Sequence, residues 1–148
     1  VTTHDMPPTA GYLAKDHIHL QSTLGLLTEP EEVEEANADR MFDTWRGILE
    51  GRGLLREGDD PVEEYVLAMH RYLAQTPSRV LCAALTDAVG DRRTQNQPGT
   101  VDEYPNWRIP LSGPDGRPLT LEDVFASQRA QRLASVMNGF ATPLVGLR

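Results

Sequence analysis

The stretch that decides the fold is SRVLCAALTD, residues 78–87. Its centre, residues 80–85, is an unbroken apolar run with polar residues on both sides. A short apolar run that follows a helical segment is typical of a strand buried on both faces, as in a parallel sheet covered by helices. We therefore predict a strand over about 79–85.

Apolar residues at helical spacing predict long helices on both sides of this run. Thr28 and Glu31 have the spacing of a capping box, which predicts the start of the first of them. Thr120 predicts a cap for the last one. The predicted helices span about 30–50, 61–75 and 120–138.

The order of elements predicts part of a larger α/β structure. The β-branched opening of residues 1–5 resembles the end of a strand, and residues 90–118 form a loop punctuated by Gly and Pro. Two parallel strands do not make a stable sheet. A chain that opens on Val1 also leads us to expect a segment of a longer protein. We predict a mainly α chain with one or two short parallel strands, the C-terminal slice of a (β/α)₈ TIM barrel.

The charge balance is acidic, with 14 Lys and Arg against 22 Asp and Glu and a net charge of −8. Such a surface repels phosphate backbones and anionic lipids, so we expect neither a nucleic acid nor a membrane partner. A neutral substrate such as a sugar is compatible with it. The single Cys82 excludes an internal disulfide. Because we find no apolar leader or membrane span, we expect a cytoplasmic protein.

His4 and Asp5 are the first candidate site, at the end of the predicted first strand. A carboxylate there could orient a substrate hydroxyl or stabilise a developing cation, with the imidazole as a donor. The alternative is an Asp that caps the following turn beside an exposed His. These two residues alone leave both interpretations open.

The second candidate site is the loop NQPGTVDEYPNWR, residues 96–108. Its amide and aromatic groups suit the hydroxyls and the apolar face of a sugar. The alternative is a loop pinned by Trp107, in which Asn106 satisfies backbone groups. Both interpretations stay open at this point.

The histidines do not predict a metal centre. His17 and His19 point to different faces of a helix, so they do not form a ligand pair. With four His, one Cys and no tight ligand spacing, we expect no metal and no cofactor.

Several motifs in order resemble one family. TTHDMP at 2–7 is similar to the Thr-His-Asp stretch after the seventh barrel strand of the 4-alpha-glucanotransferases, glycoside hydrolase family 77, also called amylomaltases or disproportionating enzymes. Residues 77–90 resemble the family's eighth strand and the turn after it. NQPGT at 96–100 and YPNWR at 104–108 resemble its Asn-x-Pro-Gly-Thr and Pro-Asn-Trp-Arg signatures. The departures are Gln97, where the family has Leu or Tyr, and the acidic pair at 102–103.

The resemblance covers essentially the whole chain and implies its organisation and chemistry. Residues 1–148 would be a single C-terminal segment of the catalytic barrel, with strand seven ending at about 1–5, strand eight at 79–85 and the last helix at 120–138. The implied activity is transfer of α-1,4-glucan segments between maltodextrins with retention of configuration, a glycosyltransferase reaction of carbohydrate metabolism. The alternative function is a non-catalytic helical interaction module.

The resemblance also implies the roles of individual residues. Asp5 would be the third catalytic acid, which holds the hydroxyls of the sugar ring and favours its distortion, and His4 would hydrogen-bond the same sugar. The nucleophile and the acid/base would lie on earlier strands outside this chain. We therefore expect the segment to be inactive alone, with a maltodextrin or other α-1,4-glucan and the missing N-terminal part of the barrel as partners. The other substrate-binding residues implied are Asn96, Pro98, Gly99 and Trp107.

Overall fold

The computed structural model describes residue 3, residues 5–56, residue 58 and residues 61–139. Within that part the chain is helical, with an isolated antiparallel bridge between Ser112 and Pro118 and no strand. None of the described helices is long and apolar enough to cross a membrane. The helices are α1 (Thr9–Leu13), α2 (Asp16–Thr23), α3 (Glu31–Gly51), α4 (Pro61–Ala74), α5 (Leu85–Val89), α6 (Leu121–Ala126) and α7 (Gln128–Asn138).

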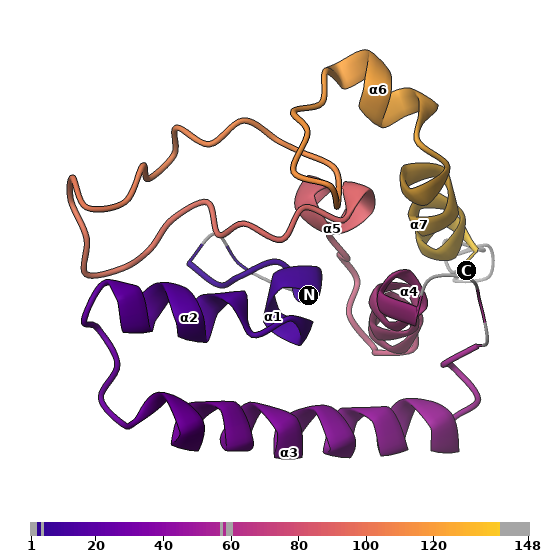
Figure 1. Ribbon diagram of the computed structural model, residues 1–148. Helices are drawn as coiled ribbons and strands as arrows, with labels where there is room; N and C mark the ends of the chain where they lie inside the picture. Colours follow the sequence, from indigo (N-terminus) through magenta and orange to yellow (C-terminus); the bar gives the residue numbers. More distant parts are fainter. Residues whose placement is uncertain (1–2, 4, 57, 59–60, 140–148) are drawn as a thin grey trace.

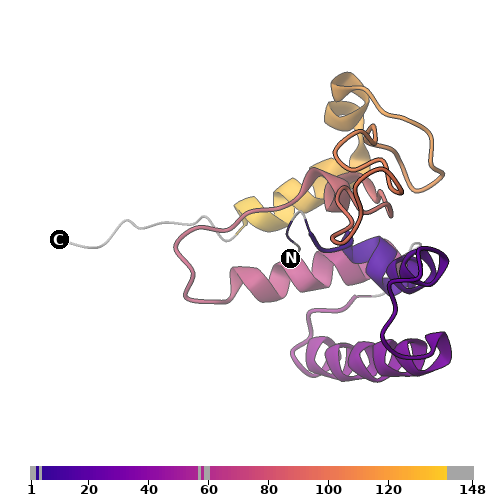
Figure 2. The same ribbon diagram turned by 90° about the vertical axis from the view of Figure 1, so that its left-hand side faces the viewer.

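Helix α4 is the centre of the fold. Figures 1 and 2 show it between α3 on one side and α5 with α7 on the other. Its residues Tyr65 and Ala68 pack with Leu49 of α3 in one buried cluster. Its Leu67 packs with Leu133 of α7 in a second cluster, which also contains a residue of α5. Because two faces of α4 are apolar, one helix joins both halves of the core.

The structure confirms the predicted helices, with one correction at a helix start and one inside the last helix. The capping box of Thr28 is wrong, because α3 begins after Pro30 and the Glu31 carboxylate is bonded to Ser22 and His19 instead. The helix predicted over 120–138 is two helices, α6 and α7. Ser127 separates them with an extended backbone, and its hydroxyl caps the start of α7. Thr120 does cap α6, as predicted.

The strand predicted over 79–85 is wrong for this chain. Residues 80–84 belong to no regular element and Leu85 already begins α5. Val80 is 79% exposed and Leu85 is 56% exposed. A central strand needs neighbouring strands for its backbone hydrogen bonds, and the described residues provide none. Of the strand end predicted over 1–5, residues 1, 2 and 4 lie outside the described residues, and residues 3 and 5 are in no strand.

Helix α1 is packed tightly against the chain that follows α5. The backbone at Gly11 comes so close that a Cβ there would lie 2.0 Å from the carbonyl oxygen of Arg92. The Arg92 guanidinium in turn donates two hydrogen bonds to Asp16, at 2.7 and 2.6 Å. Helix α1 and the start of α2 are therefore held in place by a residue that follows them by more than seventy positions.

Replacing Gly11 by Ala tests this close approach. Inside a helix Gly→Ala ordinarily stabilises by up to about 1 kcal/mol. At Gly11 we expect the opposite, a loss of about 1–3 kcal/mol in the free energy of unfolding, because backbone atoms must move to admit the methyl group. Gly47→Ala in α3 is the matched control, since a Cβ there has nothing within 4 Å. Urea unfolding measures the free energy of unfolding of both variants. Equal changes in the two variants would show that the backbone at Arg92 leaves room for a methyl group at position 11.

Candidate functional site

The structure brings the two candidate motifs together. The side-chain amide of Asn96 donates a hydrogen bond to Oδ1 of Asp5 at 2.6 Å, across 91 positions of sequence. Asp5 is exposed just before the buried pair Pro7 and Pro8, and Asn96 is half-buried in the long loop after α5. The predicted partner of Asp5, His4, lies outside the described residues. A carboxylate and an amide from different motifs thus form one polar surface.

Hydrogen bonds within the loop fix its shape around Asn106. Its side-chain oxygen accepts from the backbone N–H of Gln97 at 2.7 Å, and its amide donates to Oγ1 of Thr100 at 2.8 Å. Pro98 and Gly99 lie between these two residues in a tight turn, closed by Thr100 N–H to Gln97 carbonyl at 3.3 Å. Gly99 has φ of +87°, the left-handed value that the third position of this turn requires. Asn106 therefore satisfies backbone groups, as one of the two interpretations predicted.

Trp107 is presented on the surface by an unusual backbone. Its φ is +61°, which is rare for a bulky residue, and its side chain is 63% exposed. The backbone N–H of Trp107 donates to the carbonyl of Gln95 at 2.9 Å, which holds this conformation. The ring lines a hollow of about 280 Å³ together with Thr3 and Met6, the described neighbours of Asp5 on either side. Strain of this kind is typical of functional surfaces.

The turn at Pro98 and Gly99 lies at the other end of the loop. A Cβ on Gly99 would be 3.5 Å from the side chain of Leu26, just after α2. Figure 1 shows the loop reaching from α5 over α2. Of the predicted site residues, the structure thus joins Asp5 and Asn96 directly, while Pro98 and Gly99 shape the loop. Trp107 lies on a hollow that is also lined by Thr3, Met6 and Gln95, which are close in sequence to Asp5 and Asn96.

Asp91 is a buried carboxylate that the sequence did not single out. It accepts hydrogen bonds from the backbone N–H groups of Arg93 and Ser112, both at 2.9 Å, and from the Arg93 guanidinium. Burial alone would raise the pKa of Asp91, but these donors outweigh it and the pKa lies below its ordinary value. Asp87 is a second buried carboxylate, and it accepts hydrogen bonds from the backbone N–H and the hydroxyl of Thr9. Nothing in the sequence distinguishes these two from exposed Asp residues, so no local signal could have found them.

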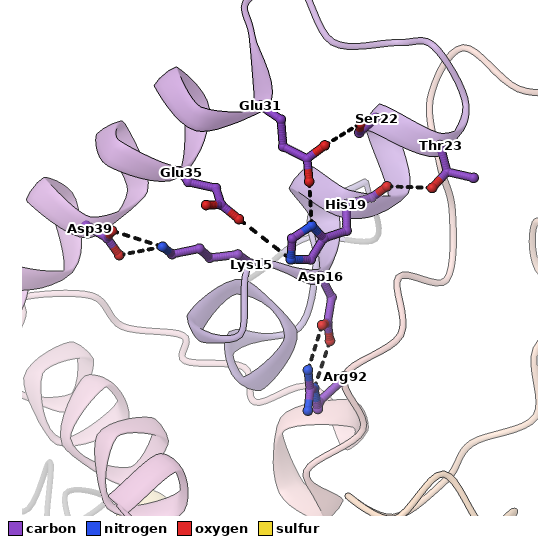
Figure 3. Close-up of polar contacts among 9 residues, drawn as sticks. All are labelled: Lys15, Asp16, His19, Ser22, Thr23, Glu31, Glu35, Asp39 and Arg92. Atoms are coloured by element: carbon purple, nitrogen blue, oxygen red, sulfur yellow. Dashed lines mark hydrogen bonds and ion pairs between the residues drawn. The ribbon is translucent and has the colours of Figure 1, made fainter.

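One group of described side chains has ligand atoms close enough to hold a metal ion. His19, Glu31 and Glu35 place one such atom each within 4.8 Å of one another. Figure 3 shows that they are already paired. His19 Nδ1 lies 2.6 Å from Glu31 and Nε2 lies 3.7 Å from Glu35. Hydrogen bonds from Ser22 first, and then from His19, hold the pKa of Glu31 below its ordinary value. Ion pairing between α2 and α3 accounts for this arrangement.

His17 faces away from that cluster, as predicted. Its ring stacks on Tyr12 with centroids 4.6 Å apart, so His17 and His19 do not share a ligand position.

His70 is fully buried on α4, and its Nδ1 is bonded to the carbonyl of Val66 at 2.8 Å.

Comparisons with known proteins agree with the motifs. The sequence model of the family described as 4-alpha-glucanotransferase matches residues 1–115. Curated 4-alpha-glucanotransferases of Mycobacterium tuberculosis (strain H37Rv) and Mycobacterium bovis are 60% identical to this chain over 145 residues, which are 96% of this chain and 20% of theirs. The crystal structure of amylomaltase from Corynebacterium glutamicum is 35% identical, with a TM-score of 0.85 over 93% of this chain and 21% of that chain.

The chain thus spans about a fifth of the length of the curated relatives it matches. Amylomaltase is a TIM-barrel enzyme, and the mainly helical structure described above corresponds to a small part of it. Motifs, family match and structural likeness agree over most of the chain, which belongs to the 4-alpha-glucanotransferase family, glycoside hydrolase family 77.

Proposed function

We propose that this chain is the C-terminal part of a retaining 4-alpha-glucanotransferase that moves α-1,4-glucan segments between maltodextrins. Family membership supports the reaction, and the single observation that carries the site is the 2.6 Å hydrogen bond between Asp5 and Asn96. It joins two of the sequence motifs that resemble the family, TTHDMP at 2–7 and NQPGT at 96–100. Because the single Cys82 leaves no disulfide framework, we place the enzyme in cytoplasmic carbohydrate metabolism.

Asp5 is the group that stabilises the transition state. The scissile sugar becomes positively charged and distorted as its glycosidic bond breaks, whereas the bound glucan is neutral. A fixed carboxylate therefore stabilises the transition state more than the ground state. The Asn96 amide fixes that carboxylate through Oδ1, so that it is oriented before the glucan binds. His4 hydrogen-bonds the same sugar.

The loop supplies the remaining contacts with the glucan. The exposed ring of Trp107 packs against the apolar face of a sugar unit beside Asp5. Pro98 and Gly99 offer a turn whose shape is fixed by the hydrogen bonds around Asn106. The reaction that we propose uses carboxylates and hydrogen-bond donors, and assigns no role to a cofactor or metal.

The rest of the barrel supplies the nucleophile and the acid/base. Retention requires two such carboxylates about 5 Å apart, and we assign neither role to an acid of this chain. The rest of the barrel also covers the apolar surface around residues 80–85. There a groove of about 460 Å³ opens between these residues and α7, beside Phe125, which is 76% exposed. An exposed apolar surface of this size is more typical of an interface, here with the rest of the barrel, than of a surface in contact with solvent.

Asp5→Asn in the full-length transferase tests the assigned role. The exposed Asp5 carboxylate contributes little to packing, so we expect an unchanged fold and a loss of kcat on the order of 10³, about 4 kcal/mol. Asp102→Asn, an equal change at another exposed loop acid, is the matched control and should stay within a few-fold of wild type. Initial rates of glucose release and maltodextrin elongation measure both. Near-wild-type rates for Asp5→Asn would remove the carboxylate from the mechanism.

The isolated 148-residue chain should not catalyse transfer. A stabilising carboxylate without a nucleophile forms no glycosyl-enzyme intermediate. We expect no glucose and no longer maltodextrins from maltotriose, and recovery of transfer when the remaining part of the enzyme is added. Turnover by the purified chain that disappears in its Asp5→Asn variant would show that the whole catalytic set lies here.

A further inference from the structure

We propose that Asp87 and Asp91 are positioning residues that together set the contact between Asp5 and Asn96. Asp87 holds the segment that carries Asp5, and Asp91 holds the loop that carries Asn96. Asp91 lies outside the family motifs, and Asp87 lies at the end of the stretch 78–87, for which no side-chain role was predicted. Its catalytic consequence rests on the function proposed for Asp5.

Asp87 serves as the N-terminal cap of a helix from which it is distant in sequence. Its carboxylate accepts from the backbone N–H of Thr9 at 2.8 Å and from the Thr9 hydroxyl at 3.1 Å, across 78 positions. Helix α1 has no side-chain cap of its own, because Pro8 occupies that position. The Asp87 side chain is fully buried, so water cannot replace it as acceptor. The start of α1 is therefore fixed by α5.

The connection from Thr9 back to Asp5 is short and stiff. It contains Pro7 and Pro8, whose rings restrict φ and which are both buried. The backbone N–H of Met6 donates to the carbonyl of Thr3 at 3.1 Å, which closes a turn around Asp5. A displacement of Thr9 is consequently transmitted to the Asp5 carboxylate rather than absorbed on the way.

Asp91 closes the base of the loop in the same manner. It is fully buried and binds the two ends of the segment 93–112, at the backbone N–H groups of Arg93 and Ser112. The Arg93 guanidinium also donates to the carbonyl of Pro110. Asn96 follows Arg93 by three residues, so Asp91 fixes the departure of the chain toward Asn96.

Asp87 and Asp91 are close to one another in the chain. Asp87 and Asp91 lie on either side of Gly90, whose φ of +78° ends α5. The close approach of Gly11 to the Arg92 carbonyl puts α1 directly against the chain after Asp91. The Asp5 and Asn96 segments thus share one rigid base, built around α5.

His70 completes the surroundings of Asp87. Its Nε2 lies 3.9 Å from Asp87 Oδ2, and its Nδ1 is engaged by the Val66 carbonyl. Burial lowers the pKa of His70, which favours the neutral ring; with Nδ1 donating to the Val66 carbonyl, Nε2 of that ring is an acceptor. Thr9 is therefore the donor that Asp87 depends on. An Asn at position 87 keeps the shape and could donate to His70, but it offers Thr9 one acceptor oxygen in place of two.

The experiment compares Asp87→Asn and Asp91→Asn with a matched control in the full-length transferase. Asp123→Asn is that control, because Asp123 accepts from Thr120 N–H at 2.9 Å and from the Thr120 hydroxyl at 3.0 Å at the start of α6. For the two proposed residues we expect kcat to fall on the order of 10²-fold with KM nearly constant, since a displacement of about 1 Å has that effect. The control should keep its kcat.

A double-mutant cycle separates positioning from simple destabilisation. If Asp87 acts through Asp5, then Asp87→Asn added to Asp5→Asn should produce little further loss of kcat. Additive losses would mean that Asp87 acts elsewhere and would overturn the proposal. Thr9→Val, which removes only the hydroxyl donor, should show a smaller loss of the same kind and serves if Asp87→Asn does not fold.

Crystal structures of the full-length variants provide a readout that does not depend on activity. We expect the distance from Asn96 Nδ2 to Asp5 Oδ1 to lengthen from 2.6 Å beyond hydrogen-bonding range in Asp87→Asn and Asp91→Asn, and to stay unchanged in Asp123→Asn. An unchanged distance together with an unchanged kcat would leave the two carboxylates as structural groups only. If the parent protein shows no glucan transfer, the proposed function fails, and this distance still decides the positioning role.

Discussion

The structure depends on the rule that a buried carboxylate must be supplied with hydrogen-bond donors. Leaving such a group charged and without donors costs several kcal/mol, a large fraction of the stability of a typical domain. Asp87 and Asp91 meet the rule with donors from three different parts of the chain: α1, the start of the long loop and its end. The five-residue helix α1 could not persist alone. Its position is therefore a consequence of the donors that α5 requires.

This base explains how a loop of nearly thirty residues can carry a defined site. The loop has little regular structure, yet Asp91, Asn106 and the Thr94 carbonyl, which accepts from the Tyr104 hydroxyl at 2.6 Å, tie it at successive points. Asn96 is then held against Asp5, and Trp107 is held at a hollow that Thr3 and Met6 also line. A sugar site benefits from such rigidity, because hydroxyl groups discriminate only when their partners are preorganised.

Local patterns in the sequence predicted local structure well. The apolar spacing along α3 and α4 gave their extents to within a residue or two, since an amphipathic helix repeats its signal over several turns. The strand prediction at 80–85 was wrong because the same apolar composition suits both a central strand and an exposed connecting segment. The capping box predicted at Thr28 was wrong because the Glu31 carboxylate binds Ser22 and His19 instead, and no spacing rule reveals these partners. Motifs identified Asp5 and Asn96 separately, but their hydrogen bond joins residues 91 positions apart. The hydrogen bond between Thr9 and Asp87, which supports the Asp5 segment, joins residues 78 positions apart. Local patterns do not reveal such pairs.

The closeness of Gly11 to the Arg92 carbonyl also constrains how this protein can evolve. Apart from synonymous changes, every single-base change of a glycine codon gives either a stop or a residue with a Cβ atom. Any amino-acid substitution at position 11 is therefore expected to destabilise the fold, unless the backbone near residue 92 moves to make room for the side chain. An exposed loop residue such as Asp102 is under no such geometric restriction. The exposed part of the loop can accordingly vary in sequence while the contact of α1 with the chain after α5 stays the same.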